Sequence, residues 1–163
     1  MKILLINPPR FNELLGKDPS IIVEHGGHNP PLGLLSLAGY LKLHTDHEVE
    51  ILDAQPDIMA YDVLEHEIAN RNCDVVGITA MTFTLIDVIK TVQLVKKHHS
   101  NAKVILGGPH VHIFPNETIE LPGVDFLVQG EGEKSFVKLL ENLERPSELA
   151  EEKGFVFKYD GKI

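Results

Sequence analysis

The sequence predicts an α/β fold in which a five-stranded parallel sheet is covered by helices on both faces. Five short apolar segments alternate with segments of helical periodicity, which is the pattern of repeated βαβ units. Most of the apolar segments are continuous runs, as expected for strands buried on both faces. The runs end in glycine, proline or polar residues, and in a parallel sheet these ends gather at one edge, where ligands bind.

Composition narrows the classes of function. The 163 residues suggest one domain, and a formal net charge of -9 argues against nucleic acid or an anionic membrane as partner. No apolar run reaches the roughly 18 residues needed to span a bilayer, so no membrane association is expected. The single cysteine, Cys73, excludes an intramolecular disulfide and predicts a reducing, cytoplasmic setting. One cysteine also cannot hold an iron–sulfur cluster, which needs three or four.

The first half of the chain contains two predicted strands and two predicted helices. Residues 2–7 form the first strand, which Pro8 and Pro9 close, and an irregular polar loop follows. A leucine-rich helix over residues 32–44 begins after a proline pair, and its small residues suggest close packing against the sheet or a ligand. Residues 48–53 alternate as an edge or half-exposed strand does, and residues 58–71 have helical periodicity.

The next segment adds a third and a fourth strand. Residues 74–79 form the third, and a helix over residues 84–97 follows. Thr84 and Asp87 resemble a capping box at its start, with aspartate in place of the usual glutamate. The fourth strand covers residues 103–106.

The last segment contains a fifth strand and a fragment of a hairpin. A short helical turn at residues 116–121 precedes the strand at 126–129, and a helix over 133–143 follows it. Beyond Arg145 and Pro146, residues 155–158 and 162–163 indicate a hairpin whose second strand is cut off. For five parallel strands we expect the order 2-1-3-4-5, the flavodoxin-like arrangement.

Two glycine pairs are the strongest sign of a binding site. Gly107-Gly108 ends the fourth strand and Gly130-Glu-Gly132 ends the fifth, so main chain could approach a bound group closely at both. Tight strand-to-helix turns would also explain either pair alone. Neither is a nucleotide motif, because the G-x-G-x-x-G signature belongs after the first strand and no G-x-x-x-x-G-K-[ST] loop occurs. Glu131 and Glu133 would also repel a phosphate at that helix start.

Other familiar sites are disfavoured. A phospho-acceptor receiver domain needs its aspartate at the end of the third strand, where this chain has Thr79. The nine histidines lack C-x-x-C or H-E-x-x-H spacing, so we expect no metal ligand among them. His110 is the histidine that lies on the glycine-rich edge. Of the threonines after the third strand, one is expected to cap the next helix and the others are free to contact a ligand.

Several of these segments, in their order and spacing, resemble one family. The chain is similar to the N-terminal cobalamin-binding domain of cobalamin-dependent radical S-adenosylmethionine (SAM) enzymes, the group that includes anaerobic magnesium-protoporphyrin monomethyl ester cyclase. The resemblance rests on KILLINPP (2–9), NPPLGLLSLAGYL (29–41), DVVGIT (74–79), VILGGPH (104–110) and GVDFLVQGEGE (123–133), and extends over nearly the whole chain.

The resemblance implies a flavodoxin-like domain at residues 1–145 with the corrin ring over the strand ends and the benzimidazole tail tucked towards the sheet. Residues 146–163 would lead into a radical SAM domain in the same polypeptide, which would carry a [4Fe-4S] cluster and SAM. Carried over by position, the cofactor-binding residues would be Asn7, Pro8, Thr79, Met81, Thr82, Gly107, Gly108, Pro109, His110, Gly130, Glu131 and Gly132.

Two motifs that related enzymes carry are missing. The D-x-H-x-x-G motif of methionine-synthase-like domains, whose histidine ligates cobalt, is absent, so base-off cobalamin without a histidine ligand from the protein is expected. His25 and His28 are weak candidates. The cluster motif C-x-x-x-C-x-x-C is also absent, so this segment alone should not catalyse, while the parent enzyme would be a methyltransferase or an oxidative cyclase. The alternative is a flavodoxin-like regulatory or interaction domain that binds no corrinoid.

Overall fold

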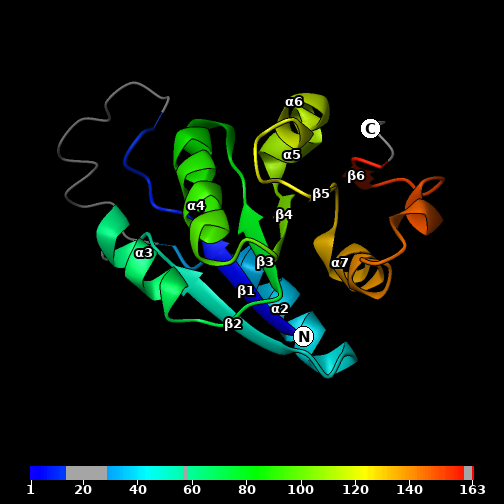
Figure 1. Ribbon diagram of the computed structural model, residues 1–163, viewed down its shortest axis with the longest axis horizontal. Helices are drawn as coiled ribbons and strands as arrows, with labels where there is room; N and C mark the ends of the chain where they lie inside the picture. The colour runs from blue at the N-terminus through cyan, green and yellow to red at the C-terminus, as the bar shows by residue number, and fades with distance from the viewer. Residues whose placement is uncertain (14–28, 57–58, 160–162) are drawn as a thin grey trace.

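The computed structural model describes residues 1–13, 29–56, 59–159 and 163, and its centre is a six-stranded sheet. The strand order is β2-β1-β3-β4-β5-β6, and the first five are parallel (Figure 1). The predicted order 2-1-3-4-5 and the edge position of the second strand are therefore confirmed. The strands are β1 (Lys2–Asn7), β2 (Glu48–Asp53), β3 (Val75–Thr79), β4 (Lys103–Gly107), β5 (Phe126–Val128) and β6 (Phe155–Phe157).

The sixth strand is a correction to the predicted hairpin fragment. β6 pairs antiparallel with β5, with Phe157 opposite Phe126 and Phe155 opposite Val128. Without it, three apolar residues of β5 would form an open sheet edge, and such edges invite pairing with other chains. Residues 160–162, which include part of the predicted second hairpin strand, lie outside the described residues.

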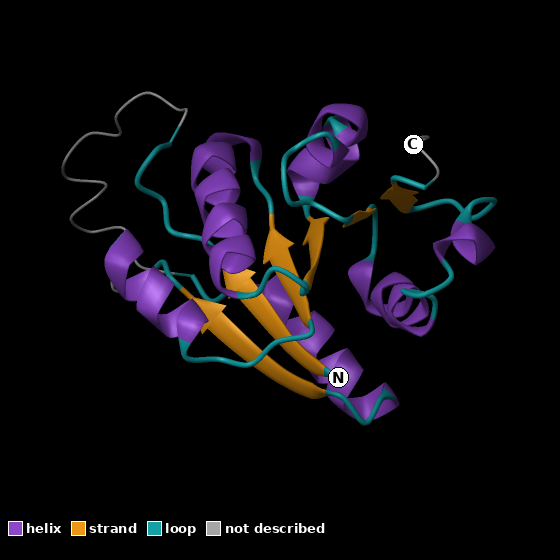
Figure 2. Cartoon of the chain, viewed as in Figure 1, coloured by secondary structure: helices purple, strands orange, loops and turns teal. Residues whose placement is uncertain are grey.

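Helices cover both faces of the sheet, as predicted (Figures 1 and 2). One face carries α2 (Leu32–His44) and α7 (Gly132–Glu141), whose leucines and Phe136 pack with Ile3, Leu5 and Ile105 of the strands. The other face carries α3 (Tyr61–Ala69), α4 (Leu85–His98), α5 (Pro109–Ile113) and α6 (Pro115–Ile119), packed on the opposite side chains of the same strands. The remaining helical turns are η1 (Thr82–Thr84) and η2 (Pro146–Leu149). Among the described residues, none of these helices has the length and apolarity that a bilayer crossing requires.

Two local expectations are wrong. The sequence predicted a single turn at 116–121, whereas α5 already begins at Pro109, directly after Gly108. Thr84 and Asp87 do not form a capping box, because the side chain of Thr84 makes no cap hydrogen bond to α4. Its hydroxyl instead donates to the carbonyl of Met81 at 3.3 Å. The carboxylate of Asp87 is fully buried and accepts hydrogen bonds from residues far away in sequence.

Candidate functional site

The carboxyl ends of the parallel strands form one continuous edge, which we call the rim. Register places Asn7 beside Asp53, Thr79 beside Gly107, and Gly107 beside Val128. The rim is therefore assembled from residues more than a hundred positions apart, as expected for a parallel α/β sheet.

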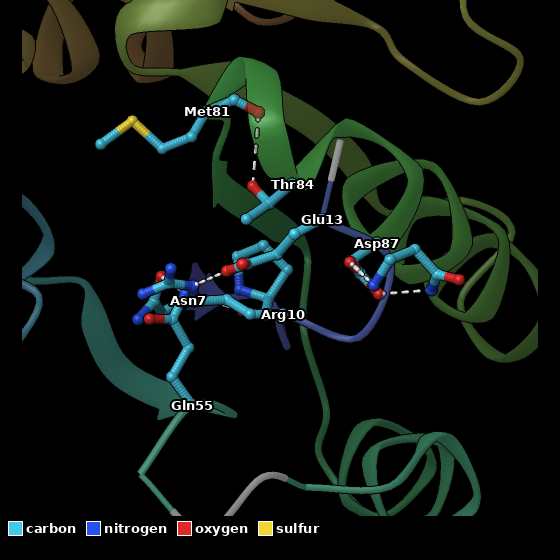
Figure 3. Close-up of polar contacts among 9 residues, drawn as sticks. Asn7, Arg10, Glu13, Gln55, Met81, Thr84 and Asp87 are labelled. Carbon is cyan, nitrogen blue, oxygen red and sulfur yellow. Dashed lines mark hydrogen bonds and ion pairs between the residues drawn. The ribbon is translucent and has the colours of Figure 1, made fainter. Parts of the chain in front are cut away.

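At one end of the rim, the buried amide of Asn7 is held by the protein itself. Its Nδ2 donates to the carboxylate of Asp53 at 2.8 Å. Its Oδ1 accepts from Gln55 Nε2 at 3.2 Å, and Figure 3 shows Asn7 and Gln55. Gln55 also donates to the carbonyl of Pro8 at 3.0 Å. Asn7 and Pro8, both predicted site residues, thus shape this end of the rim through a fixed hydrogen-bond network.

At the centre of the rim, Gly108 lets two turns pack tightly. It has a φ of +104°, and a Cβ there would lie 2.9 Å from the carbonyl oxygen of Ala80. Ala80 itself donates to the carbonyl of Gly107 at 2.7 Å and accepts from the amide of His110 at 3.1 Å. The turn after β4 is thereby joined to the turn after β3, with only main chain between them.

An inner cavity of about 220 Å³ opens at the rim and extends between α2 and α7 towards the sheet. Side chains from both helices and from three strands make its apolar wall. Six predicted site residues line it: Thr79, Gly107, Gly108, Gly130, Glu131 and Gly132. The other lining residues are Leu5, Gly33, Leu34, Leu37, Gly77, Ile78, Ile105, Val128, Glu133 and Phe136.

Missing side chains create much of this space. A Cβ added at Gly33 or Gly132 would meet no atom within 4 Å, so both glycines border open volume. A Cβ at Gly77 would lie 2.8 Å from the Cδ2 atom of Leu5 and 3.4 Å from the ring of Phe136. The cavity is therefore a glycine-lined slot that ordinary side chains would narrow.

Two outer cavities adjoin the inner one at Gly108, which lines all three. One, of about 420 Å³, includes Asn7, Thr79, Met81 and Pro109 in its wall. The other, of about 400 Å³, is lined by Pro109, His112, Ile113, Gly130 and Glu131, with Gly108. The rim thus offers a broad concave surface above a narrower apolar slot.

Three predicted site residues, Pro8, Thr82 and His110, line none of these three cavities. The ring of His110 is buried beside Phe114, with ring centroids 5.3 Å apart, and its Nδ1 lies 3.1 Å from the hydroxyl of Thr82. Burial lowers the pKa of His110, and Glu117 opposes this effect more weakly. In this position His110 supports the turn after β4.

The mouth of the inner cavity carries negative charge. The carboxylate of Glu133 accepts a hydrogen bond from the hydroxyl of Ser36 at 2.5 Å, which ties α7 to α2. That hydrogen bond, followed by one from its own backbone amide, holds the pKa of Glu133 below its usual value. Glu133 is therefore ionised at neutral pH and accepts hydrogen bonds rather than donating them.

The sequence-based prediction missed the part of the inner cavity that lies away from the strand ends. Gly33, Leu34 and Leu37 of α2 and Phe136 of α7 line it, although they precede or follow the rim turns. The small residues of the leucine-rich helix were the available signal. His25 and His28, the weak candidates for cobalt ligation, lie outside the described residues. Across the described ranges, no three or more His, Cys, Asp or Glu side chains gather closely enough to hold a metal ion.

A buried carboxylate anchors the chain that leaves β1 near the rim. Asp87 accepts from the backbone amide and from the side-chain Nδ2 of Asn12, both at 2.9 Å (Figure 3). The hydroxyl of Tyr61 also donates to Asp87. Arg10, two residues before Asn12, lies over the ring of Phe83 at 5.3 Å and lines the cavity of about 420 Å³.

Comparison with known proteins identifies the family. The model of the B12 binding domain family matches residues 20–140. A protein described as an uncharacterized methyltransferase, PH0819 of Pyrococcus horikoshii, is 34% identical over all of this chain, which spans 34% of that protein. The anaerobic magnesium-protoporphyrin IX monomethyl ester cyclase of Synechocystis sp. is 31% identical, again over all of this chain and 32% of the cyclase.

Solved structures share the fold. The radical SAM methyltransferase TsrM from Kitasatospora setae, with cobalamin and a [4Fe-4S] cluster bound, superposes with a TM-score of 0.75 at 20% identity, over 98% of this chain and 29% of TsrM. The cobalamin-dependent SAM radical enzyme OxsB, with aqua-cobalamin and SAM bound, gives a TM-score of 0.76 at 17% identity, over 99% of this chain and 21% of OxsB. The chain thus spans about a third or less of each of these proteins.

Proposed function

Because the chain belongs to the B12-binding domain family, we propose that it binds cobalamin, with the corrin ring over the rim and the nucleotide tail in the inner cavity. The observation that carries this proposal is the glycine-lined slot between α2 and α7, which opens directly at the rim. A broad concave surface above a narrow apolar slot suits a flat macrocycle that carries a pendant aromatic base.

The residues present fit such a group. Side chains at Gly33 and Gly132 would project into open volume, so their absence keeps the slot free. Met81 is 37% exposed and lines the outer cavity beside Pro109, where it offers apolar surface to a ring. Gly108, Gly130 and Gly132 expose main-chain groups that can meet the amide side chains of a corrin.

We propose that this domain supplies no histidine ligand to cobalt, so that the bound cobalamin is base-off. His110, the histidine predicted at the rim, is buried beside Phe114 and paired with Thr82, and it would have to leave this packing to reach the outer cavities. His112 does line the outer cavity of about 400 Å³, so the proposal includes that His112 makes no bond to cobalt, which the spectrum described below tests. Cobalamin when bound would supply cobalt-centred group-transfer chemistry, and this domain's residues would hold and orient it.

The longer relatives extend the proposal to the parent protein. A radical SAM domain in the same polypeptide, with its [4Fe-4S] cluster and SAM, would provide the catalysis, either methyl transfer or oxidative cyclisation. Residues 146–163 would lead towards that domain, although β6 is already part of this sheet. The presence of a single cysteine, Cys73, supports a cytoplasmic location. Burial raises the pKa of the Cys73 thiol to about 11, so that little of it is in the reactive thiolate form. The alternative of a regulatory or interaction domain without corrinoid leaves the glycine-lined slot without a role.

Retention of corrinoid tests the proposal. The purified chain mixed with hydroxocobalamin should keep a red chromophore through gel filtration at about one corrinoid per chain. Complete separation of colour and protein would contradict cobalamin binding. A second experiment uses cobinamide, which lacks the benzimidazole. When cobinamide is bound to the chain and its cobalt is reduced to Co(II), the EPR spectrum should show no nitrogen superhyperfine splitting. Nitrogen splitting in this complex would show that a histidine of the protein binds cobalt.

A further inference from the structure

The distribution of polar and apolar side chains from the mouth to the floor of the inner cavity indicates which corrinoids this site accepts. Its polar side chains, Thr79, Glu131 and Glu133, come from the rim and from the start of α7. Away from the rim the wall is made of hydrocarbon side chains from two strands and two helices. They are Leu5, Leu34, Leu37, Ile105 and Phe136, each less than 10% exposed and all part of one core cluster. Val128, the last residue of β5, lies at the rim itself, in register with Gly107.

The cavity floor provides no polar side chain among the described residues that line it. Thr79 Oγ1 lies close to Gly108, since a Cβ built there would be 3.2 Å from it, so this hydroxyl belongs to the mouth. The carboxylate of Glu133 is already bonded to Ser36 at the junction of α2 and α7. The carbonyl of Gly107 accepts the amide of Ala80 at 2.7 Å. The main chain at Leu5, Gly77 and Ile105 is paired within the sheet. A group that reaches the floor therefore meets no polar side chain that could pair with its own donors and acceptors.

Corrinoids differ in the base at the end of the nucleotide tail. The outer edge of 5,6-dimethylbenzimidazole carries only C–H and methyl groups. Adenine carries ring nitrogens and an exocyclic amine at the corresponding edge. Burying donors and acceptors without partners opposes binding, whereas burying methyl groups favours it. The apolar floor of the slot should therefore favour the edge of dimethylbenzimidazole over the polar edge of adenine.

We propose that this site selects corrinoids by their lower base, accepting benzimidazole-type bases in the inner cavity and rejecting purine bases. The inference rests on the proposed binding of cobalamin and assigns the selectivity to the apolar floor, with Ile105 on β4 as its most testable residue. Gly77 contributes by leaving room between Leu5 and Phe136, where a Cβ would be too close to Leu5.

Equilibrium binding of three corrinoids tests the proposal on the intact chain. Cobalamin should bind at least about tenfold more tightly than the adenine-containing analogue, a difference of about 1.4 kcal/mol. Cobinamide, which has no base, should also bind more weakly than cobalamin. Equal affinity for cobalamin and the adenine analogue, or for cobalamin and cobinamide, would overturn the selectivity and leave cobalamin binding intact. If none of the three binds, the proposed function and the selectivity both fail.

A pair of matched substitutions locates the effect. Ile105→Thr places a hydroxyl in the cavity wall two residues before the rim, and Ile6→Thr places one in an equally buried strand position on the opposite face of the sheet. Ile105→Thr should weaken cobalamin binding several-fold, leave cobinamide binding unchanged and reduce the preference for cobalamin over the adenine analogue. Ile6→Thr should leave the ratio of cobalamin to cobinamide affinity unchanged. An unaltered ratio in Ile105→Thr, or an equal change in both variants, would contradict contact between Ile105 and the base.

Discussion

At the scale of single residues, Gly108 and His110 build the centre of the rim from one short stretch of chain. Gly108 has a positive φ that side-chain-bearing residues rarely adopt, and Ala80 leaves no room for a Cβ there. His110, two residues later, turns inward and bonds Thr82 instead of facing the cavities. The sequence placed both residues at the rim correctly, but it could not show which of them points outward.

Burial of His110 predicts a dependence of stability on pH. Its pKa is lowered from the ordinary 6.5 by burial, so the unfolded chain binds the proton more readily than the folded one. The free energy of unfolding should therefore be fully maintained above about pH 6.5 and fall as pH decreases towards the lowered pKa. Urea denaturation at about pH 5 and about pH 8 measures the loss.

The variant His110→Gln keeps a polar group and should lose less stability over that interval than the unaltered chain. Exposed His112 provides the matched control, and His112→Gln should behave like the unaltered chain. The pKa of His47 is also lowered by burial. Because His47 is present in all three proteins, its contribution to the pH dependence of the free energy of unfolding is the same in each and does not affect the comparison. Identical losses in His110→Gln and in the unaltered chain would contradict the assignment.

At the scale of elements, α2 both packs on the sheet and borders the proposed binding site. Leu34, Leu37 and Leu41 pack on the sheet, while Gly33 borders both the inner cavity and an outer one. A second glycine, Gly39, lies in the same helix and is exposed, and it lines none of the three cavities. A Cβ at either glycine meets nothing within 4 Å.

These two glycines form a matched pair for mutation. Gly33→Ala and Gly39→Ala should each stabilise the protein by about 0.5–1 kcal/mol, because alanine favours the helix. Only Gly33→Ala puts a methyl group into the proposed binding volume, so it alone should weaken cobalamin, by about tenfold if overpacking costs about 1.4 kcal/mol. Denaturation and equilibrium binding check the two effects separately. Equal cobalamin affinity in the two variants would show that Gly33 does not border the ligand.

Elements with a clear hydrophobic pattern were predicted most accurately from the sequence. β1, α2 and β2 begin and end where the sequence placed them, because long apolar runs and clear alternation mark their limits. The five-residue helix α5 was missed, since so short a segment has too few turns to show a period. β6 was seen as a strand, but its partner was not, because strand pairing depends on neighbours distant in sequence.

At the scale of the whole molecule, one buried cluster ties the segment after β1 to α3 and α4. Asp87 joins the backbone of Asn12 to the hydroxyl of Tyr61, and Lys90 lies 4.6 Å from the centre of the Tyr61 ring. Burial is the main cause that raises the pKa of Tyr61, with the hydrogen bond and charge of Asp87 adding to it. The phenol is therefore protonated at neutral pH and donates its hydrogen to Asp87.

Tyr61→Phe tests how much this cluster stabilises the fold. Removing a donor to a buried carboxylate should lower the free energy of unfolding by about 1.5 kcal/mol. Tyr40→Phe is the control, because Tyr40 stacks on His44 with centroids 4.1 Å apart, a contact that phenylalanine keeps. Urea denaturation should show little change in Tyr40→Phe. Similar losses in both variants would indicate that the Tyr61 hydroxyl adds nothing beyond its ring.

The sequence by itself determined the five parallel strands and the glycine turns at their ends, because these depend on local patterns of apolar and small residues. Their order was expected only as the commonest arrangement of five such strands, and the structure established it. The resemblance it carried pointed to the family that the comparisons then showed. Only the tertiary structure decided that α2 and α7 enclose a slot beneath the rim, that His110 is buried and that Asp87 serves Asn12 and Tyr61. Each of these features depends on side chains far apart in the chain, and their contacts are set by packing rather than by local sequence.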